Sequence, residues 1–163
     1  EHVPAVAAAP GVRAVPYASL QHGFLLFNGR PSHPLLADRA LRRALTLAID
    51  REALVRNVFD SLALPGAGPF ARAQAHADTT LPLLPFDPAA AERALDSLGW
   101  RRAAPDAPRA RGGRSLRFAL LVPATSAARV RSAVVVQEQL RRVGVHVDVE
   151  TREFGAFLRA QET

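Results

Sequence analysis

Two stripes of apolar residues follow one another along residues 38–62, each with the spacing of an amphipathic helix. They consist of Leu41, Ala44, Leu45, Ala48 and Ile49, and of Leu54, Val55, Val58, Phe59 and Leu62. Asp38 precedes the first stripe and Asp50 separates the two, and aspartate is a favourable helix N-cap. Glu52 then falls in a first turn, where an acidic side chain suits the helix dipole. The pattern predicts two helices that meet at Asp50. The alternative is one bent helix with a solvated Asp50.

The C-terminal half alternates between strand and helix patterns. Residues 116–122 and 145–150 read as strands, and a helix from Ser126 to about residue 143 ends at Gly144. Two strands joined by a helix predict a parallel pair with a right-handed crossover. Asp87-Pro88 opens another helix as N-cap and first residue, and Gly99 closes it. A last helix is expected over 154–160.

The remaining segments carry weaker patterns. Short strands are expected at 12–15 and 22–28, and Pro31 and Pro34 should keep the next residues extended. Residues 63–86 contain four prolines and two glycines without periodicity, which is typical of a functional or surface-packed loop. Residues 101–114 are expected to form a surface loop. Together these elements predict an α/β fold with a small mixed sheet and flanking helices.

Composition changes this picture little. At 163 residues the chain fits one domain, and it has no cysteine for disulfides or thiol ligands. The net charge of +6 suits an acidic partner such as nucleic acid or an anionic membrane. However, all 21 basic residues are arginine, which a GC-rich coding sequence also produces. No apolar stretch reaches the ~20 residues of a membrane span. Because methionine is absent, we expect a processed chain or an excised piece.

Few residues suggest chemistry. His146, Asp148 and Glu150 share one strand face, but side chains roughly 7 Å apart suit a polar surface better than one metal ion. The other histidines lack ligand spacing, and no nucleotide-binding or nucleophile motif is present. The RGGR motif at 111–114 is compatible with a phosphate contact or, more simply, a turn. We therefore expect no enzyme, no metal and no cofactor.

One long segment is informative as a whole. "LLFNGRPSHPLLADRALRRALTLAIDREALV" resembles the central signature of the family 5 extracellular solute-binding proteins, the dipeptide/oligopeptide-binding class of ABC importers. The matching positions are Phe27, Asn28, Pro34, Asp38, Arg42, Ala44, Asp50, Arg51 and Glu52. The later order also agrees: "LPGAGPF", "FDPAAAERALDSLGW", a Gly-Gly loop, an apolar strand and "QEQLRRVGVHVDV". In this family Asp38, Asp50 and Asp87 would be structural helix caps.

The resemblance implies part of one lobe of a type II periplasmic-binding-protein-like fold, with residues 1–163 as a single α/β lobe fragment. It implies a substrate-binding component that captures a peptide or similar small solute by lobe closure and delivers it to ABC permease subunits. The expected location is the periplasm or the outer face of the cytoplasmic membrane, with a lipid anchor as a further option. Ligand identity stays open, because relatives of the family take peptides, nickel complexes, haem or sugars.

Candidate ligand contacts follow from the expected sheet. Ligands of open α/β sheets bind beyond the carboxyl ends of the strands, which points to Thr125, Ser126 and the following helix N-terminus. The resemblance adds His22 and Phe24 from a strand that faces the cleft in the family, and Tyr17, which is near that strand. The simpler alternatives are Ser126 as an ordinary cap and Phe24 as a core residue. The acidic residue that receives a peptide's amino group in the family follows the last helix, so no residue here is assigned to it.

Two other functions stay open from the sequence. A solute-sensing domain of a transcription regulator would share the fold, and an upstream helix-turn-helix would indicate it. An Arg-rich nucleic-acid-binding domain would bind with an affinity that falls steeply with salt. The scattered positions of the arginines argue against the second, so no nucleic-acid partner is expected.

Overall fold

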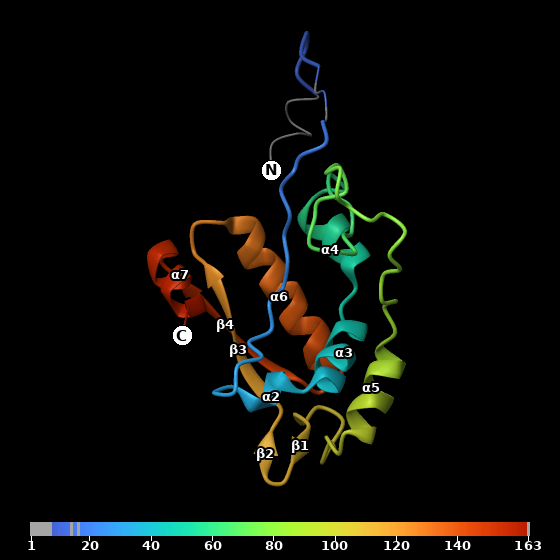
Figure 1. Cartoon of the computed structure of the whole chain (residues 1–163), viewed down its shortest axis with the longest axis vertical. Helices are drawn as coiled ribbons and strands as arrows, with labels where there is room; N and C mark the ends of the chain where they lie inside the picture. Colours follow the sequence, from blue (N-terminus) through green and yellow to red (C-terminus); the bar gives the residue numbers. More distant parts are fainter. Residues whose placement is uncertain (1–7, 14, 16, 163) are drawn as a thin grey trace.

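A parallel strand–helix–strand unit packs against a layer of short helices (Figure 1). The structure is a computed structural model that describes residues 8–13, 15 and 17–162. Strand β3 (Arg117–Pro123) leads into helix α6 (Ala127–Arg142), which returns to strand β4 (His146–Arg152). The two strands pair in parallel, with Arg117 opposite His146 and Pro123 opposite Arg152. The predicted parallel pair and its crossover helix are confirmed.

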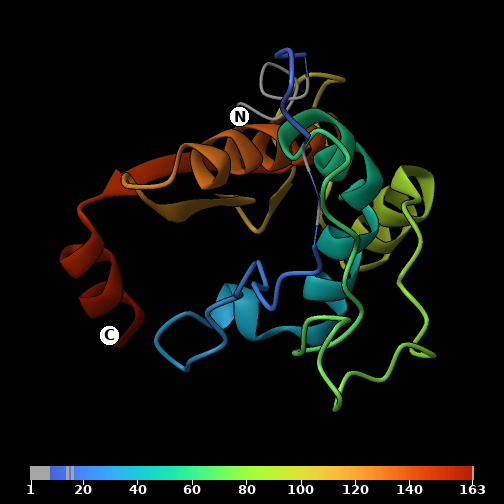
Figure 2. The same cartoon turned by 90° about the horizontal axis from the view of Figure 1, so that it is seen from above.

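The described residues contain five further helices. They are α2 (Pro34–Ala37), α3 (Arg39–Leu47), α4 (Arg51–Val58), α5 (Pro88–Ser97) and α7 (Phe154–Glu162). Figure 2 shows α6 alongside the strand pair, α3 to α5 to the right of them, α2 below the strand pair, and α7 beyond the ends of the strands. The α/β class is confirmed. Antiparallel and parallel pairs form two separate small sheets, instead of one mixed sheet.

The core lies between α3, α5, α6 and the inner face of β4. Its fully buried large side chains are Leu41, Leu45, Leu95, Leu116, Leu140, Val143, Val145 and Val147. The predicted stripe of α3 supplies the first two and that of α5 the third. Both α5 and α6 end at glycines with positive φ, Gly99 at 83° and Gly144 at 80°. In each case the next residue donates its N–H back to the last turn, which satisfies carbonyls that a helix end leaves free.

Asp50 lies at a joint between two helices. Its carboxylate accepts the Ala53 N–H at 2.9 Å and so caps α4, while Asp38 caps α3 through the N–H groups of Ala40 and Leu41. Gln139 of α6 braces the joint, since its Oε1 accepts the Asp50 N–H at 3.1 Å. The two-helix interpretation is confirmed. Asp87 likewise caps α5 by accepting the Ala90 N–H at 2.8 Å.

This geometry predicts a measurable cap energy. Asp50→Ala should lower the free energy of unfolding by about 1 kcal/mol, because the first turn of α4 loses its acceptor. Asp50→Asn should restore most of that loss, since asparagine caps as well as aspartate. Urea unfolding followed by circular dichroism measures both values. Equal losses in the two variants would show that the charge of Asp50, and not its capping oxygen, matters.

Two N-terminal expectations are wrong. Residues 12, 13 and 15 of the expected strand 12–15 form no strand, and Ala14 lies outside the described residues. Residues 22–28 also lack strand structure. No other described segment supplies a ladder for them, and a strand needs such a partner. Instead, Leu25, Leu26 and Phe27 lie beside an apolar hollow of about 30 Å³ that Phe118 and Leu140 also line.

The segment after Pro31 is also corrected. Pro34 does not keep the chain extended; it opens the single-turn helix α2. A proline is acceptable there because the first helical residue needs no N–H. His33, the residue before Pro34, has φ −123° and ψ 61°, so it avoids the α region that a following proline disfavours.

The expected surface loop 101–114 contains structure. It holds a small hairpin, β1 (Ala110–Arg111) and β2 (Arg114–Ser115), and one buried arginine. The Arg109 side chain is only 4 % exposed. Its guanidinium donates to the Val143 carbonyl at 2.8 Å, to the Trp100 carbonyl at 2.8 Å and to the Asp96 carboxylate at 2.6 Å. Arg109 therefore joins the C-terminal ends of α5 and α6.

Candidate functional site

The carboxyl ends of β3 and β4 meet at one edge of the sheet. Pro123 pairs with Arg152 at the last register position, and the Ala124 N–H donates to the Arg152 carbonyl at 2.8 Å. The turn that enters α6 and the turn that enters α7 therefore lie side by side. This edge is where open α/β sheets place their ligands.

The α6 start has unused hydrogen-bond donors. Ser126 Oγ accepts only a long hydrogen bond, 3.4 Å from the Arg129 N–H. Within the described part of the chain, no acceptor is seen for the N–H groups of Ala127 and Ala128. Thr125 is exposed next to them. A helix N-terminus with free N–H groups and nearby hydroxyls suits a carboxylate or another small anion.

The neighbouring helix shows the same interaction already satisfied. Glu153 precedes α7, and its carboxylate oxygens accept the N–H groups of Gly155 at 2.9 Å and Ala156 at 3.1 Å. These two backbone donors hold the pKa of Glu153 below its ordinary value. The start of α7 is thus occupied by the chain's own carboxylate. Of the two helix N-termini at this edge, the one at α6 is therefore the one whose backbone N–H groups remain without an acceptor in the described residues.

The predicted N-terminal contacts lie in an irregular segment. Tyr17 is 89 % exposed and Phe24 is 73 % exposed, so Phe24 is not a core residue either. The rings of His22 and Phe24 stack at 6.1 Å between centroids. Gly66 lies close to His22, because a Cβ added there would come within 3.2 Å of the imidazole. This segment therefore runs against the loop 63–86.

The structure assembles the predicted contacts only in part. It pairs His22 with Phe24 and places Thr125 beside Ser126. Among the described residues, no hydrogen bond or ring contact joins these two groups. The sequence signal for Thr125 and Ser126 was their place after a strand. His22 and Phe24 were assigned on a strand that does not form, and Tyr17 was assigned because it is near that segment.

The loop 63–86 holds a hollow that the sequence did not indicate. Phe70, His76 and Asp78 line it together with neighbouring loop residues, and its volume is about 160 Å³. The rings of Phe70 and His76 lie 6.3 Å apart. Ligand pockets usually enclose roughly 300 Å³ or more, so this hollow is too small to be a complete solute site.

The polar face of β4 is neutralised by arginines. Asp148 accepts two hydrogen bonds from Arg117 across the strands, at 2.6 and 2.7 Å, and Glu150 accepts one from Arg152 at 2.7 Å. Hydrogen bonding to Arg117 is the main reason that the pKa of Asp148 is lowered. His146 lies 3.4 Å from the same carboxylate. These carboxylates are therefore engaged by guanidinium groups, as expected for a solvent-facing surface.

No metal-binding cluster is seen in the described part of the chain. Residues 8–13, 15 and 17–162 contain no group of three or more acidic, histidine or cysteine side chains arranged to hold an ion. In the same residues, none of the helices is both long enough and apolar enough to cross a membrane.

Comparison with known proteins identifies the family of the chain. A family model described as bacterial extracellular solute-binding proteins, family 5, middle part, matches residues 1–163. The oligopeptide-binding protein AppA of Bacillus subtilis is 30 % identical over 138 residues, which cover 83 % of this chain and 25 % of AppA. Protein XP55 of Streptomyces lividans is 34 % identical over 113 residues, or 69 % of this chain and 20 % of XP55. The chain thus spans about a quarter or less of these relatives.

Solved structures lead to the same group. AppA from Bacillus subtilis in complex with a nonapeptide superposes with a TM-score of 0.73 and 28 % identity, covering 78 % of this chain and 26 % of AppA. NikA from Brucella suis in complex with Fe(III)-EDTA gives a TM-score of 0.72 and 30 % identity over 77 % of this chain and 25 % of NikA. These relatives are solute-binding transport proteins and not enzymes. They favour a solute-binding role over the regulator and nucleic-acid alternatives.

Proposed function

Because the chain belongs to the family 5 bacterial extracellular solute-binding proteins, we propose that it forms part of one lobe of an ABC importer's substrate-binding component. The complete protein would capture a peptide or a similar small solute between two lobes and present it to permease subunits. No bond is made or broken in this role. The family match over the whole chain is the observation that carries the proposal.

Lobe closure supplies the mechanism. A ligand can shift an open–closed equilibrium only by binding the closed form more tightly, so it must contact both lobes. Residues 1–163 would provide one set of contacts at the carboxyl edge of β3 and β4. The free N–H groups of α6, with Thr125 and Ser126, would receive a carboxylate of the solute. His22, Phe24 and Tyr17 would line the cleft from the adjacent N-terminal segment.

The proposed location follows from the family. Its members are extracellular or periplasmic, and we propose the same for this protein, with a lipid anchor at the outer face of the cytoplasmic membrane as a further part of the proposal. A peptide is the proposed ligand because AppA was crystallised with one. A metal chelate such as the one in NikA is the second candidate.

Removing both hydroxyls at the edge tests the proposed contact. In the complete gene product, Thr125→Val combined with Ser126→Ala should weaken peptide binding about tenfold, because a carboxylate loses two hydrogen-bond donors. Calorimetric titration with peptide pools of two to nine residues measures the affinity. Bound peptide should also raise the thermal midpoint, since it binds only the folded state.

A matched control removes hydroxyls elsewhere. Thr46 and Ser132 donate within their own helices, to the Arg42 carbonyl at 2.8 Å and the Ala128 carbonyl at 2.9 Å. Thr46→Val with Ser132→Ala should leave the peptide affinity unchanged. An edge variant that binds as tightly as the control contradicts the assigned contact. If neither peptides nor metal chelates bind the unaltered protein, the proposed function itself is wrong.

A further inference from the structure

The hairpin that carries the RGGR motif concentrates positive charge at one end of the molecule. Residues 101–114 contain five arginines and a single acidic residue. The chain reverses at Gly112 and Gly113, whose φ angles of 57° and 77° glycine tolerates well. In the antiparallel register Arg111 lies opposite Arg114. Like charges opposite each other destabilise a strand pair. The stability of the hairpin therefore does not explain why two arginines face each other here, and a binding role would.

Two of the five arginines are already used by the fold. Arg109 is buried against carbonyls, as described above. Arg102 donates to the Pro105 carbonyl at 2.8 Å and to the Glu92 carboxylate at 3.1 Å. Neither guanidinium is available to an outside partner.

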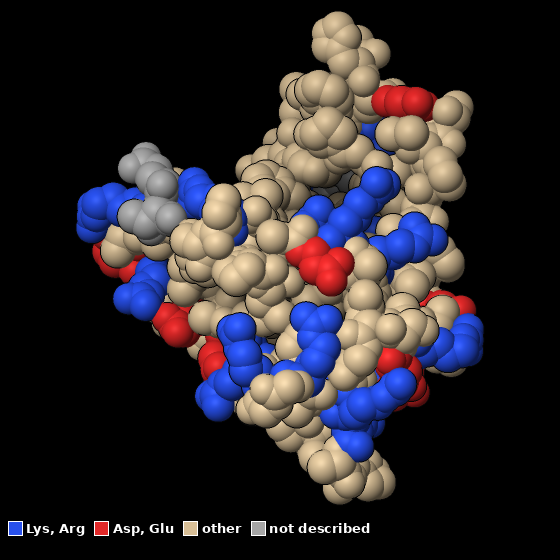
Figure 3. All heavy atoms as spheres, turned by 60° about the horizontal axis from the view of Figure 1, so that its bottom comes forward, with Lys and Arg blue, Asp and Glu red and all other residues tan. Residues whose placement is uncertain are grey.

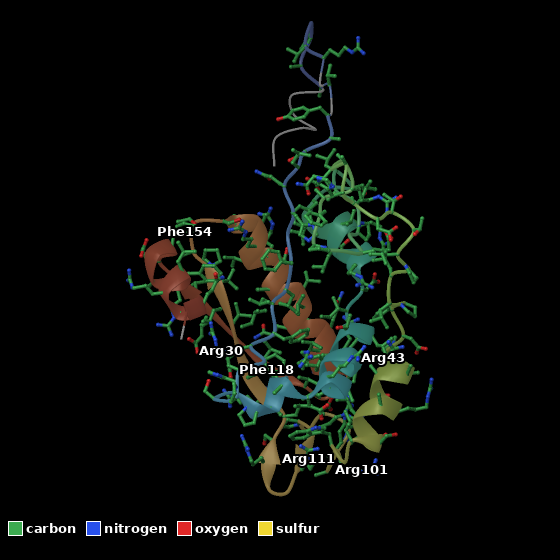
Figure 4. The ribbon with its side chains drawn as sticks, viewed as in Figure 1. Arg30, Arg43, Arg101, Arg111, Phe118 and Phe154 are labelled. Atoms are coloured by element: carbon green, nitrogen blue, oxygen red, sulfur yellow. The ribbon has the colours of Figure 1, made fainter. Side chains whose placement is uncertain are left out.

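The other three arginines are exposed, and we call Arg101, Arg111 and Arg114 the hairpin arginines. Arg101 pairs with Asp96 at 3.1 Å, yet its side chain remains 66 % exposed. Arg111 lies 4.7 Å above the Trp100 ring and donates to the Leu98 carbonyl at 3.0 Å, which fixes its direction. The Arg114 backbone belongs to the β1–β2 ladder, but its side chain has no hydrogen-bond or ion-pair partner among the described residues. Figure 4 shows Arg101 and Arg111 beside each other at the β1–β2 end.

The chemistry of this end favours a phosphate-bearing surface over a protein. Figure 3, with the hairpin end turned forward, shows many arginines and few carboxylates there. Within the described residues 87–133, no large hydrophobic side chain is exposed. Protein interfaces usually need such apolar or aromatic anchors, whereas contact with lipid headgroups does not. One guanidinium group can donate two parallel hydrogen bonds to two oxygens of the same phosphate, and this geometry suits phospholipid headgroups.

We propose that the hairpin arginines bind the phosphate groups of an anionic phospholipid surface and hold this end of the protein against the membrane. This proposal rests on the proposed location of the protein at the outer face of the cytoplasmic membrane. It does not depend on the proposed solute contacts. Each arginine close to an anionic bilayer should strengthen binding about fivefold at low salt. Added salt should screen most of this attraction.

Vesicle co-sedimentation tests the proposal with the 163-residue chain. The chain should bind vesicles of phosphatidylglycerol and phosphatidylcholine and not vesicles of phosphatidylcholine alone. Arg114→Gln, which removes no side-chain hydrogen bond or ion pair seen in the described residues, should weaken binding about fivefold, and Arg111→Gln/Arg114→Gln about 25-fold. Circular dichroism verifies that each variant is folded. If the double variant is unfolded, Arg114→Gln alone carries the test.

The control variant loses the same charge elsewhere. Arg72 lies in the loop after α4 and Arg129 in the first turn of α6. Figure 1 shows α4 and the start of α6 at the opposite end of the molecule from the β1–β2 hairpin. Arg72→Gln/Arg129→Gln should change binding less than twofold. The proposal is overturned if this control weakens binding as much as the hairpin variant, or if anionic vesicles fail to bind at all. It is also overturned if inorganic phosphate displaces the chain beyond the effect of sodium chloride at equal ionic strength, because that result indicates a discrete anion site. Failure of peptide binding would leave these outcomes unaffected.

Discussion

Replacing Arg109 by alanine is expected to lower the free energy of unfolding by about 3 kcal/mol, because buried carbonyl groups lose their donors. The Arg109 guanidinium donates hydrogen bonds to the carbonyls of Val143 and Trp100, which lie at the C-terminal ends of α6 and α5. An unpaired carbonyl in the interior keeps its desolvation cost without compensation. A cation is also favourable where the negative ends of two helix dipoles converge. Urea unfolding measures the loss.

Arg101→Ala is the matched control. Arg101 contacts the same carboxylate, Asp96, but from a solvent-exposed position. Exposed ion pairs contribute roughly 0–1 kcal/mol, so this variant should stay within that range of the unaltered protein. Similar losses in the two variants would mean that Asp96, and not the helix ends, is the important partner of Arg109.

The pH dependence gives a second measure of the Arg109–Asp96 pair. Hydrogen bonding to Arg109 is the main reason that the pKa of Asp96 lies below its ordinary value of 3.8. The stability from this pair is therefore fully present above pH 3.8 and is lost as pH falls through the lower pKa of the folded state. The difference between the unaltered protein and Arg109→Ala should shrink over that acid range. A constant difference down to the lowest pH would exclude a contribution from Asp96.

Gly144→Ala should also destabilise the protein strongly, by about 2–4 kcal/mol from backbone strain and steric overlap together. Gly144 has φ +80°, a conformation that alanine adopts only with strain. An added Cβ would also lie 2.5 Å from Arg102 Nε and 2.9 Å from Arg109 Cγ. Arg109 cannot move aside without losing its hydrogen bonds. Thermal and urea unfolding both report the effect.

Gly99→Ala separates strain from overlap. Gly99 also ends a helix with positive φ, but the nearest atom to its added Cβ is Arg111 Cδ at 3.3 Å, an approach that a shift of a few tenths of an ångström relieves. This variant should cost about 1 kcal/mol, the backbone strain alone. Equal costs at Gly99 and Gly144 would show that the arginines around Gly144 yield easily, contrary to the structure.

Local signals allowed much of the fold to be predicted from the sequence. Asp38, Asp50 and Asp87 begin helices because an aspartate side chain reaches the N–H groups of its own next turn. Gly99 and Gly144 end helices because glycine accepts positive φ. These helix starts and ends depend on a few neighbouring residues, so they can be predicted from a single sequence. The parallel strand pair followed from the helix between the two strands.

Features that depend on distant partners could not be predicted. Residues 22–28 have a strand-like composition, yet a strand forms only beside another strand, and no described segment offers one. Arg109 stands in a polar, Pro- and Gly-rich loop, and only the folded chain shows that two helix ends converge on it. Its position between the stops at Gly99 and Gly144 was the one available signal.

The candidate site divides in the same way. Thr125 and Ser126 were found because they follow a strand and precede a helix. His22 and Phe24 were assigned on the missing strand and Tyr17 by its nearness to it, so their place in the cleft stays a prediction. Only the structure shows that Glu153 occupies the N-terminus of α7 while the N-terminus of α6 stays open. No sequence motif indicates this difference.

The β3–α6–β4 unit has a consequence for how the chain folds. Its strands, its crossover helix and the Arg117–Asp148 pair all lie within residues 116–152, so its contacts join residues that are near in sequence. Such contacts close small loops and form quickly, whereas the α3–α5 packing must wait for a longer stretch of chain. We therefore expect this unit to fold first. It would then provide a preformed surface against which α3 and α5 pack.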